Sequence, residues 1–254
     1  SFYYLDEIKD KIPEYLKNEY KFIDKEKAIK KIHFPNNLKD IKDSRTRLVY
    51  EELFEFMFKI NYFKYINKSI KKENVRKVSK TKLNQYIKTL PFELTKDQLK
   101  AIDDIYIDLT SSNKMNRLLQ GDVGSGKTVV AVVASYINYL AGYQTAMMAP
   151  TEILAMQHAT TIKKLLRGTG MSVVCLTGSL KLSEKKKIQE KIKQGKADFI
   201  IGTHALISDN VEFKNLGLVI TDEQHRFGVN QRTNLRNKGE LTDTLYMSAT
   251  PIPR

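Results

Sequence analysis

The sequence has a single cysteine and lacks any long uninterrupted hydrophobic run. Cys175 alone excludes a disulfide within the chain and a cysteine-based zinc cluster. It lies in the apolar run 173–176, which favours a buried structural thiol over a reactive one. No stretch approaches the roughly 20 apolar residues that a membrane-spanning helix requires. The N-terminus shows no secretory pattern, so we expect a protein of the reducing cytoplasm.

Acidic residues are scarce relative to basic ones. The chain has 43 Lys and Arg against 29 Asp and Glu, which gives a formal net charge of +14. This balance favours a polyanionic partner, because each cation placed on a phosphate releases counterions. A solvated basic surface is the alternative, since the sequence is rich in Lys, Ile and Asn throughout. Composition alone leaves both interpretations open.

The first 89 residues contain no glycine and show helical spacings. Leu5, Ile8 and Ile12 are three and four residues apart, which places them on one face of a helix. Pro13 is expected to end this helix or to open the next one, because proline lacks an N–H group and fixes φ. A longer helix is expected over residues 46–66, where apolar side chains follow a 3.6-residue rhythm.

A dense run of positive charge extends from Lys68 to Lys88, with eight basic residues and only Glu73 against them. The charge density and the lack of a periodic pattern indicate an exposed, mobile connection. Such a connection could touch DNA, but a solvated linker is the simpler interpretation. We therefore expect the first part of the chain to end at residue 89.

From Leu90 onward, short apolar runs alternate with helical segments. The expected strands are 117–120, 145–149, 173–176, 199–201, 218–221 and 245–247. The expected helices are 128–140, 153–166, 183–194 and 230–236. This alternation predicts βαβ units, and hence a parallel sheet covered by helices on both faces. In such sheets ligands bind at the carboxyl ends of the strands.

The first expected strand runs into a glycine-rich loop of the form G-x-x-x-x-G-K-T. Glycines let successive N–H groups point at phosphates, and the following helix directs its positive end at the same anion. Lys127 is expected to reach the β- and γ-phosphates, and the Thr128 hydroxyl to ligate magnesium. The alternative is an ordinary glycine turn, but the preceding strand and the apolar helix after it favour phosphate binding. The loop consists of Gly121, Asp122, Val123, Gly124, Ser125, Gly126, Lys127 and Thr128.

Two adjacent acids, Asp222 and Glu223, follow the apolar strand 218–221. In phosphoryl transfer, the first would hold magnesium through water and the second would orient and deprotonate the attacking water. Two surface acids after a strand are common in isolation. These two come 95 residues after Lys127 (222 minus 127), on another strand of the same expected sheet, which favours catalysis. The expected cofactors are ATP and Mg²⁺, and the expected catalytic residues are Glu223, Lys127 and Asp222.

Upstream of the loop, Phe92 is followed six residues later by Gln98. A glutamine side chain offers both a donor and an acceptor, which matches the paired edge of adenine. An aromatic side chain beside it could line the same site. Phe92 is as readily explained as a core residue, so this spacing alone is a weak signal.

Six ordered segments closely resemble the motifs of superfamily 2 helicases, and within that group the RecG family of fork-remodelling DNA helicases. The segments are 94–98, 121–128, 149–158, 202–206, 222–229 and 248–254. Two upstream segments, 32–35 and 45–53, resemble the helical region before the motor in that family. The resemblance implies an α/β fold, with a RecA-like P-loop NTPase lobe over residues 90–254. Residues 1–89 would be an α-helical segment that links this lobe to a wedge domain.

The resemblance also implies roles for individual residues. Gln98 would read adenine, while Gln224 and His225 would sense the γ-phosphate. Ser248 and Thr250 would couple hydrolysis to movement between lobes. Hydroxyl, amide and imidazole groups that follow strand ends would contact phosphate oxygens of branched double-stranded DNA. These DNA-binding residues are Thr151, Gln157, His158, Thr203 and His204.

Three alternatives stay open. The transcription–repair coupling factor has a closely similar motor, although Ser125 in the loop and Gln224 look more like RecG. A nucleotide-gated binding module would use ATP occupancy without productive hydrolysis, and it would not need Glu223. An RNA helicase could be built on the same scaffold, because backbone contacts distinguish the two sugars only in fine detail.

Helicases of this kind hydrolyse ATP between two motor lobes. A wedge domain and a second lobe are expected to be missing from the chain, which stops at Arg254 directly after the last motif of the first lobe. Arginines from a second lobe contribute roughly 10³ to 10⁵ in rate. The 254 residues alone are therefore expected to bind nucleotide weakly, hydrolyse it poorly and not unwind DNA.

Overall fold

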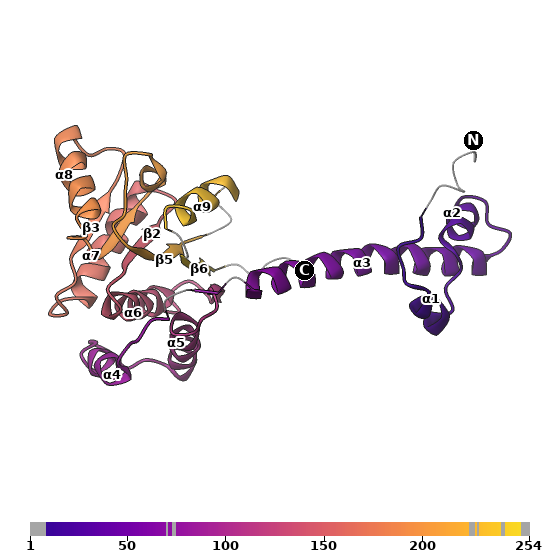
Figure 1. Cartoon of the computed structure of the whole chain (residues 1–254), viewed down its shortest axis with the longest axis horizontal. Helices are drawn as coiled ribbons and strands as arrows, with labels where there is room; N and C mark the ends of the chain where they lie inside the picture. Colours follow the sequence, from indigo (N-terminus) through magenta and orange to yellow (C-terminus); the bar gives the residue numbers. More distant parts are fainter. Residues whose placement is uncertain are drawn as a thin grey trace. The chain divides into compact units, whose positions relative to one another are not determined.

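The chain divides into two compact units, Ser1–Ser69 and Ile70–Arg254 (Figure 1). The structure is a computed structural model, and it describes residues 9–69, 71–72, 75–223, 227, 229–239 and 242–249. In these described segments, no helix combines the length and the apolar character needed to cross a membrane.

The first unit is helical. Its helices are α1 (Glu14–Tyr20), α2 (Lys25–His33) and α3 (Leu38–Ser69), and α2 packs against α3. Pro13 is the N-cap residue of α1, so this proline opens a helix. The helix expected to contain Ile12 is not found in the described part of that segment, because residues 9–12 are irregular. Residues 1–8 lie outside the described residues.

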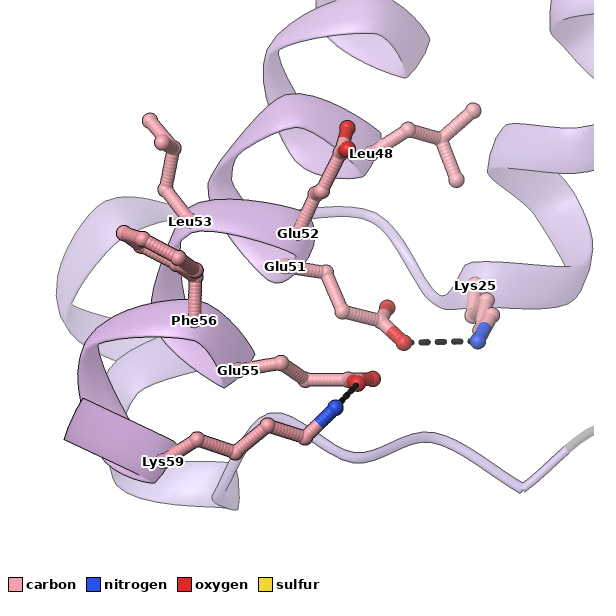
Figure 2. Close-up of a pocket in the computed structure, with 8 residues that line it drawn as sticks. All are labelled: Lys25, Leu48, Glu51, Glu52, Leu53, Glu55, Phe56 and Lys59. Carbon is pink, nitrogen blue, oxygen red and sulfur yellow. Dashed lines mark hydrogen bonds and ion pairs between the residues drawn. The ribbon is translucent and has the colours of Figure 1, made fainter. Parts of the chain in front are cut away.

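A buried ion network takes the place of a large apolar core in this unit. Arg47 on α3 is fully buried, and its guanidinium donates to the carboxylates of Asp10 and Glu51. Lys25 donates to the same Glu51 at 2.6 Å, as Figure 2 shows in the groove along α3. Among the described residues, the buried hydrophobic side chains of the unit are Ile12 and Ala28. Charge pairing therefore holds α2 and the preceding segment against α3.

The helix predicted over residues 46–66 is confirmed and is longer, because α3 extends from Leu38 to Ser69. Its apolar residues do not form a buried face within the unit. Four aromatic rings, each four residues from the next, stack along the helix with centroids 6.2–6.4 Å apart. These rings belong to Tyr50, Phe54, Phe58 and Tyr62. Several other large apolar side chains of α3 are also exposed: Val49, Leu53, Phe56, Met57 and Phe63.

The second unit is built on a six-stranded parallel sheet within the described residues, with strand order β1-β6-β5-β2-β4-β3. The strands are β1 (Asn116–Gln120), β2 (Gln144–Met148), β3 (Val173–Leu176), β4 (Phe199–Gly202), β5 (Leu216–Thr221) and β6 (Asp243–Ser248). The six predicted strands are confirmed, each to within two residues at either end. The inner strands β6, β5, β2 and β4 are almost wholly buried, as a parallel sheet with two covered faces requires, whereas the edge strands β1 and β3 are less buried.

Helices cover both faces of this sheet (Figure 1). One face carries α4 (Lys80–Lys88), α5 (Lys96–Leu109), α6 (Lys127–Leu140) and α7 (Glu152–Leu165). The other carries α8 (Leu182–Lys193), the short 3₁₀ helix η2 (His204–Ile207) and α9 (Val229–Arg236). Successive strand residues point to opposite faces, so Met147 lies in one core and Met148 in the other. The predicted α/β class, a parallel sheet sandwiched by helices after a helical segment, is confirmed.

The basic run between Lys68 and Lys88 is not a solvated linker where the structure describes it. Lys72 and Arg76 are buried, and both pair with the fully buried carboxylate of Asp243 at the start of β6. Arg76 also donates to the carbonyl of Gly217 at 2.7 Å. The prediction of an exposed connection is therefore wrong at these two residues, because a distant acid pairs with charges that look unpaired along the sequence, whereas the other lysines of the run whose burial is described are exposed.

The same segment also contributes to the apolar core. Leu83 and Tyr86 of α4 are buried with the helices on one face of the sheet. Burial raises the pKa of the Tyr86 hydroxyl, which donates to the carbonyl of Leu165 at 3.2 Å. Residues 75–89 thus pack as part of the sheet unit. The structural division falls after Ser69, whereas the sequence placed it after residue 89.

Candidate nucleotide-binding site

The glycine-rich loop lies between β1 and α6, at the carboxyl edge of the sheet. Gly124 and Gly126 have φ of +83° and +80°, a region that side-chain-bearing residues rarely adopt. Gly126 is the N-cap residue of α6, so the helix begins directly at Lys127. The N-terminal end of α6 therefore adjoins the loop, and the N–H of Val129 already donates to the carbonyl of Gly126 at 3.0 Å. This is the geometry that binds a phosphate at a helix N-terminus.

The ammonium group of Lys127 lies over the loop. Its Nζ donates to the carbonyls of Gly121 at 2.6 Å and Asp122 at 2.8 Å. Thr128 follows in the first turn of α6 and is half-buried. The loop itself thus holds the lysine at the mouth of the site, where an anionic ligand would compete for its protons.

The acidic pair follows β5 at the same edge of the sheet. All strands run parallel, and β6 alone separates β1 from β5, so two strand spacings amount to about 10 Å. Ser248, at the end of β6, lies between the two and accepts a hydrogen bond from the N–H of Gly121 at 3.3 Å. The structure therefore brings Lys127 and the pair Asp222 and Glu223 to one edge.

The Asp222 carboxylate is held at both oxygens. Its Oδ1 accepts from the N–H of Glu223 at 3.0 Å, and its Oδ2 lies 2.8 Å from Nε2 of His158 on α7. The N–H of Asp222 donates to the carbonyl of Met148, the last residue of β2. Glu223 has φ of +47°, a strained conformation for a non-glycine residue, of the kind that concentrates at functional sites. The Asp222 carboxylate is thus held in place, and Glu223 follows it in a constrained backbone conformation.

Gln98 is tied to the phosphate-binding loop. Its Nε2 donates to the carbonyl of Ser125 at 2.9 Å, and its Oε1 accepts from the N–H of Thr95 at 2.9 Å. Thr95 in turn caps α5, which makes a reciprocal capping box. Phe92 is 47% exposed and lines a groove with Leu90 and other apolar side chains before α5. The glutamine expected to read adenine therefore also braces the loop, a contact that spacing did not predict.

The residues expected to contact DNA fall into two environments. Thr151 is exposed and caps α7, accepting from the N–H of Leu154, and Gln157 is exposed on the same helix. His204 is exposed at the start of η2, whereas Thr203 is only 2% exposed. His158 points inward to Asp222. Three of the five therefore lie on the surface and two are turned into the protein.

The remaining predicted site residues lie at the margins of what is described. Ser248 is buried at the end of β6. Gln224, His225 and Thr250 lie outside the described residues. The oxygens offered by Thr128 and Asp222 are hard ligands, the type that Mg²⁺ prefers, and both sit at the same sheet edge. The donor set therefore fits a divalent cation of this kind.

A second polar contact that the sequence did not predict holds the start of α7. Glu152 accepts at Oε1 from the N–H of Ser179 at 3.1 Å, in the turn after β3. Hydrogen bonds from Ser179 hold the pKa of Glu152 below its ordinary value. Spacing along the chain gives no signal for this contact or for that of His158. The first joins residues 27 positions apart, and the second joins residues 64 positions apart.

Comparison with known proteins decides the family. The DEAD/DEAH box helicase family matches residues 95–254, which include the phosphate-binding loop and the acidic pair. The chain belongs to the DEAD/DEAH box helicase family. Membership of this family implies use of a nucleotide.

Within the family, the chain is similar to proteins described as "ATP-dependent DNA helicase RecG". It is 48% identical to that of Bacillus subtilis (strain 168) over 99% of its own length and 37% of the relative's. It is 47% identical to that of Thermotoga maritima over 97% of its length and 32% of the relative's. The chain thus spans about a third of the length of the curated relatives that it matches.

A solved structure supports the same likeness. The chain superposes on a structure of RecG bound to a three-way DNA junction with a TM-score of 0.82. The match has 44% sequence identity and covers 97% of this chain and 33% of that one. The resemblance to RecG-type superfamily 2 helicases, read from the motifs, is confirmed at this level.

Proposed function

We propose that the protein is an ATP-dependent DNA helicase or translocase that acts on branched DNA, such as stalled replication forks and Holliday junctions, in recombination and repair. The observation that carries the proposal is the shared sheet edge of Lys127 and the Asp222–Glu223 pair, in a chain of the helicase family. The likeness to RecG, solved with a DNA junction, supports branched DNA as the substrate.

The 254 residues would supply the nucleotide-binding lobe of such a motor. Residues 90–254 would form this first RecA-like lobe, and residues 1–89 would connect it to a wedge domain. A second motor lobe would complete the site. The chain alone would therefore bind nucleotide weakly and turn it over poorly, because the stabilising arginines would come from elsewhere. A motor of this kind would work in the cytoplasm.

Each residue at the edge has a proposed role. Lys127 would leave the loop carbonyls and neutralise the β- and γ-phosphates, and Glu223 would take a proton from the attacking water. Thr128 and Asp222 would hold magnesium, whose charge would stabilise the phosphate oxygens. Gln98 and Phe92 would contact adenine, and Gln224 and His225 the γ-phosphate. Ser248 and Thr250 would couple the site to lobe movement.

DNA would bind through its phosphate backbone at the surface around the start of α7 and η2. Of the five residues expected to contact DNA, the exposed Thr151, Gln157 and His204 are the proposed contacts. The exposed members carry hydroxyl, amide and imidazole groups that suit phosphate oxygens. The net charge of +14 supports a polyanionic partner.

The test is a Glu223→Gln variant of the full-length gene product. Loss of the water-activating carboxylate should lower ATP turnover by roughly 10² to 10⁴ while ATP binding is retained. Glu212→Gln is the matched control, because Glu212 pairs with Lys193 on the surface away from the sheet edge. Turnover and the affinity for a fluorescent ATP analogue should be measured for both. Unchanged turnover in Glu223→Gln would overturn catalysis and favour a nucleotide-gated switch.

The substrate class is tested separately on the wild-type protein. Forked DNA and an RNA duplex of matching sequence are compared as substrates for ATP-driven unwinding. The proposal expects unwinding of the fork and little of the RNA duplex. Preferential unwinding of RNA would replace DNA helicase by RNA helicase. Movement along DNA duplexes without activity on branched DNA would favour a translocase of the transcription–repair type.

A further inference from the structure

His158 occupies a position that a simple DNA contact does not require. It lies on α7, in the second turn, and its Nε2 is 2.8 Å from Oδ2 of Asp222. Both side chains are only 15% exposed. A carboxylate oxygen accepts hydrogen bonds, so in this pair the imidazole N–H at Nε2 is the donor and Oδ2 the acceptor. The imidazole therefore fixes the second oxygen of a carboxylate whose first oxygen is held by the N–H of Glu223.

The backbone provides a second tie between the same two segments. The N–H of Asp222 donates to the carbonyl of Met148 at 3.0 Å, where β2 ends. Residues 149–151 then lead directly from β2 into α7. Main chain and side chain of Asp222 are thus both held by the continuous β2–α7 segment. A displacement of α7 would be transmitted to the carboxylate.

These turns of α7 have one buried side and one exposed side. Ala155 and Ala159 are buried against the sheet, which anchors α7 on its inner side. Gln157 and Met156 are exposed, next to His158 in sequence. The same short stretch of helix therefore exposes Met156 and Gln157 and directs the imidazole of His158 at Asp222.

We infer that His158 is a positioning residue that couples occupancy of the outer face of α7 by a nucleic-acid backbone to the orientation of the Asp222 carboxylate. The inference rests on the proposed function, because it assumes that Asp222 serves a bound nucleotide and its cation. Partners that orient a metal-binding side chain commonly change metal affinity by roughly 10- to 100-fold when they are removed. His158 then acts through Asp222 and does not itself touch the reacting atoms.

The test compares His158→Ala and His158→Gln in the full-length protein. The glutamine amide can place a donor near the position of Nε2, whereas alanine cannot. Binding of a fluorescent ATP analogue is followed as Mg²⁺ is added, with and without forked DNA. His158→Ala should raise the Mg²⁺ concentration for half-maximal binding by about 10-fold. His158→Gln should bring this Mg²⁺ concentration back to within roughly threefold of the wild-type value, because the amide restores the hydrogen bond to Asp222.

Coupling is read from the effect of DNA on the same titration. Forked DNA should shift the half-maximal Mg²⁺ concentration of the wild-type protein and of His158→Gln, but not of His158→Ala. Thr160→Ala is the matched control, because Thr160 is exposed on α7 and its hydroxyl donates to the carbonyl of Met156 within the same helix at 3.0 Å. Its titration should match that of the wild-type protein.

Other outcomes separate this inference from the proposed function. Wild-type titrations in both His158 variants would overturn the inference while leaving the helicase proposal in place. Equal defects in His158→Ala and His158→Gln, with a matching loss of thermal stability, would assign His158 a purely structural role and would also overturn it. A wild-type protein that binds no ATP analogue at any Mg²⁺ concentration would refute the proposed function itself.

Discussion

The two units of the chain are stabilised in different ways. The sheet unit buries a continuous set of apolar side chains on both faces of its strands, including Phe199 and Ile137 at 0% exposure. The helical unit surrounds a buried Arg47 with carboxylates and leaves most of the apolar residues of α3 exposed. Apolar burial has no directional requirement, whereas a buried ion network depends on every partner. The helical unit should therefore be the more fragile to a single polar substitution.

The contrast also separates what each unit contributes. The candidate site lies wholly in the sheet unit, where the strands fix the ends that carry Gly121, Asp222 and Ser248. A rigid scaffold of this kind can hold ligand-binding loops at a defined separation. Damage to the helical unit should therefore leave nucleotide binding in place, and damage to the sheet core should remove it.

The largest effect should come from the sheet core. Phe199→Ala removes a fully buried ring from β4 and should destabilise this unit by about 3–5 kcal/mol. Urea unfolding should shift to lower concentration, and nucleotide binding should be lost in the same transition. Leu99→Ala, at a position 41% exposed on α5, should change stability by no more than about 0.5 kcal/mol. Separate transitions for folding and binding would break the proposed link between core and site.

Arg47→Met should have the next largest effect, confined to the helical unit. Methionine fills similar space but leaves the carboxylates of Asp10 and Glu51 without their central cation, which should cost about 3 kcal/mol. Limited proteolysis should then cut within residues 9–69 while binding of an ATP analogue persists. Arg45→Met, at an exposed position of the same helix, is the control. Loss of nucleotide binding along with the helical unit would contradict the division.

Removing one ring from the aromatic stack should have a smaller effect. Phe54 stacks between Tyr50 and Phe58, so Phe54→Leu should destabilise the helical unit by about 1 kcal/mol. Phe56→Leu, at a position 60% exposed on the neighbouring face, serves as the comparison. Thermal melting of the helical signal measures both. Equal melting temperatures for the two variants would show that stacking adds nothing beyond burial.

The smallest effect should be the pH dependence contributed by Glu152. Hydrogen bonds from Ser179 lower its folded pKa below the ordinary 4.5, so the ionised form stabilises the fold. That stabilisation is fully present above pH 4.5 and is lost as the pH falls through the lower folded value. The stability difference between wild type and Glu152→Gln should therefore be constant near neutral pH and shrink in acid. Glu184→Gln on α8 is the control. A difference that grows in acid would have the wrong sign.

Much of the sheet unit could be predicted from the sequence, because its signals are local. Short apolar stretches mark the strands, and the glycine loop must lie between a strand and a helix to bind phosphate. Parallel strands place their carboxyl ends together, so the convergence of Lys127 with Asp222 also follows from the pattern. Strand order does not, since no local feature records which strands pair.

Several errors came from contacts between distant residues. Lys72 and Arg76 look like linker charges because their acid, Asp243, lies 167 residues beyond Arg76. The sequence analysis does not predict α4 or α5, although α5 carries a local signal: Ile102, Ile105 and Leu109 recur at three- and four-residue spacing after the capping residue Thr95. For His158, the motif resemblance implies a DNA contact, and nothing in the sequence shows that its ring lies 2.8 Å from the Asp222 carboxylate.

The central claim is that Lys127 and the Asp222–Glu223 pair serve one nucleotide. A crystal structure of the protein with a non-hydrolysable ATP analogue and Mg²⁺ tests it most directly. We predict that Nζ of Lys127 lies within hydrogen-bonding distance of the β- or γ-phosphate, and that Asp222 contacts the same magnesium directly or through one water. A triphosphate bound away from the loop between β1 and α6, or a magnesium ion out of reach of Asp222, would contradict the claim.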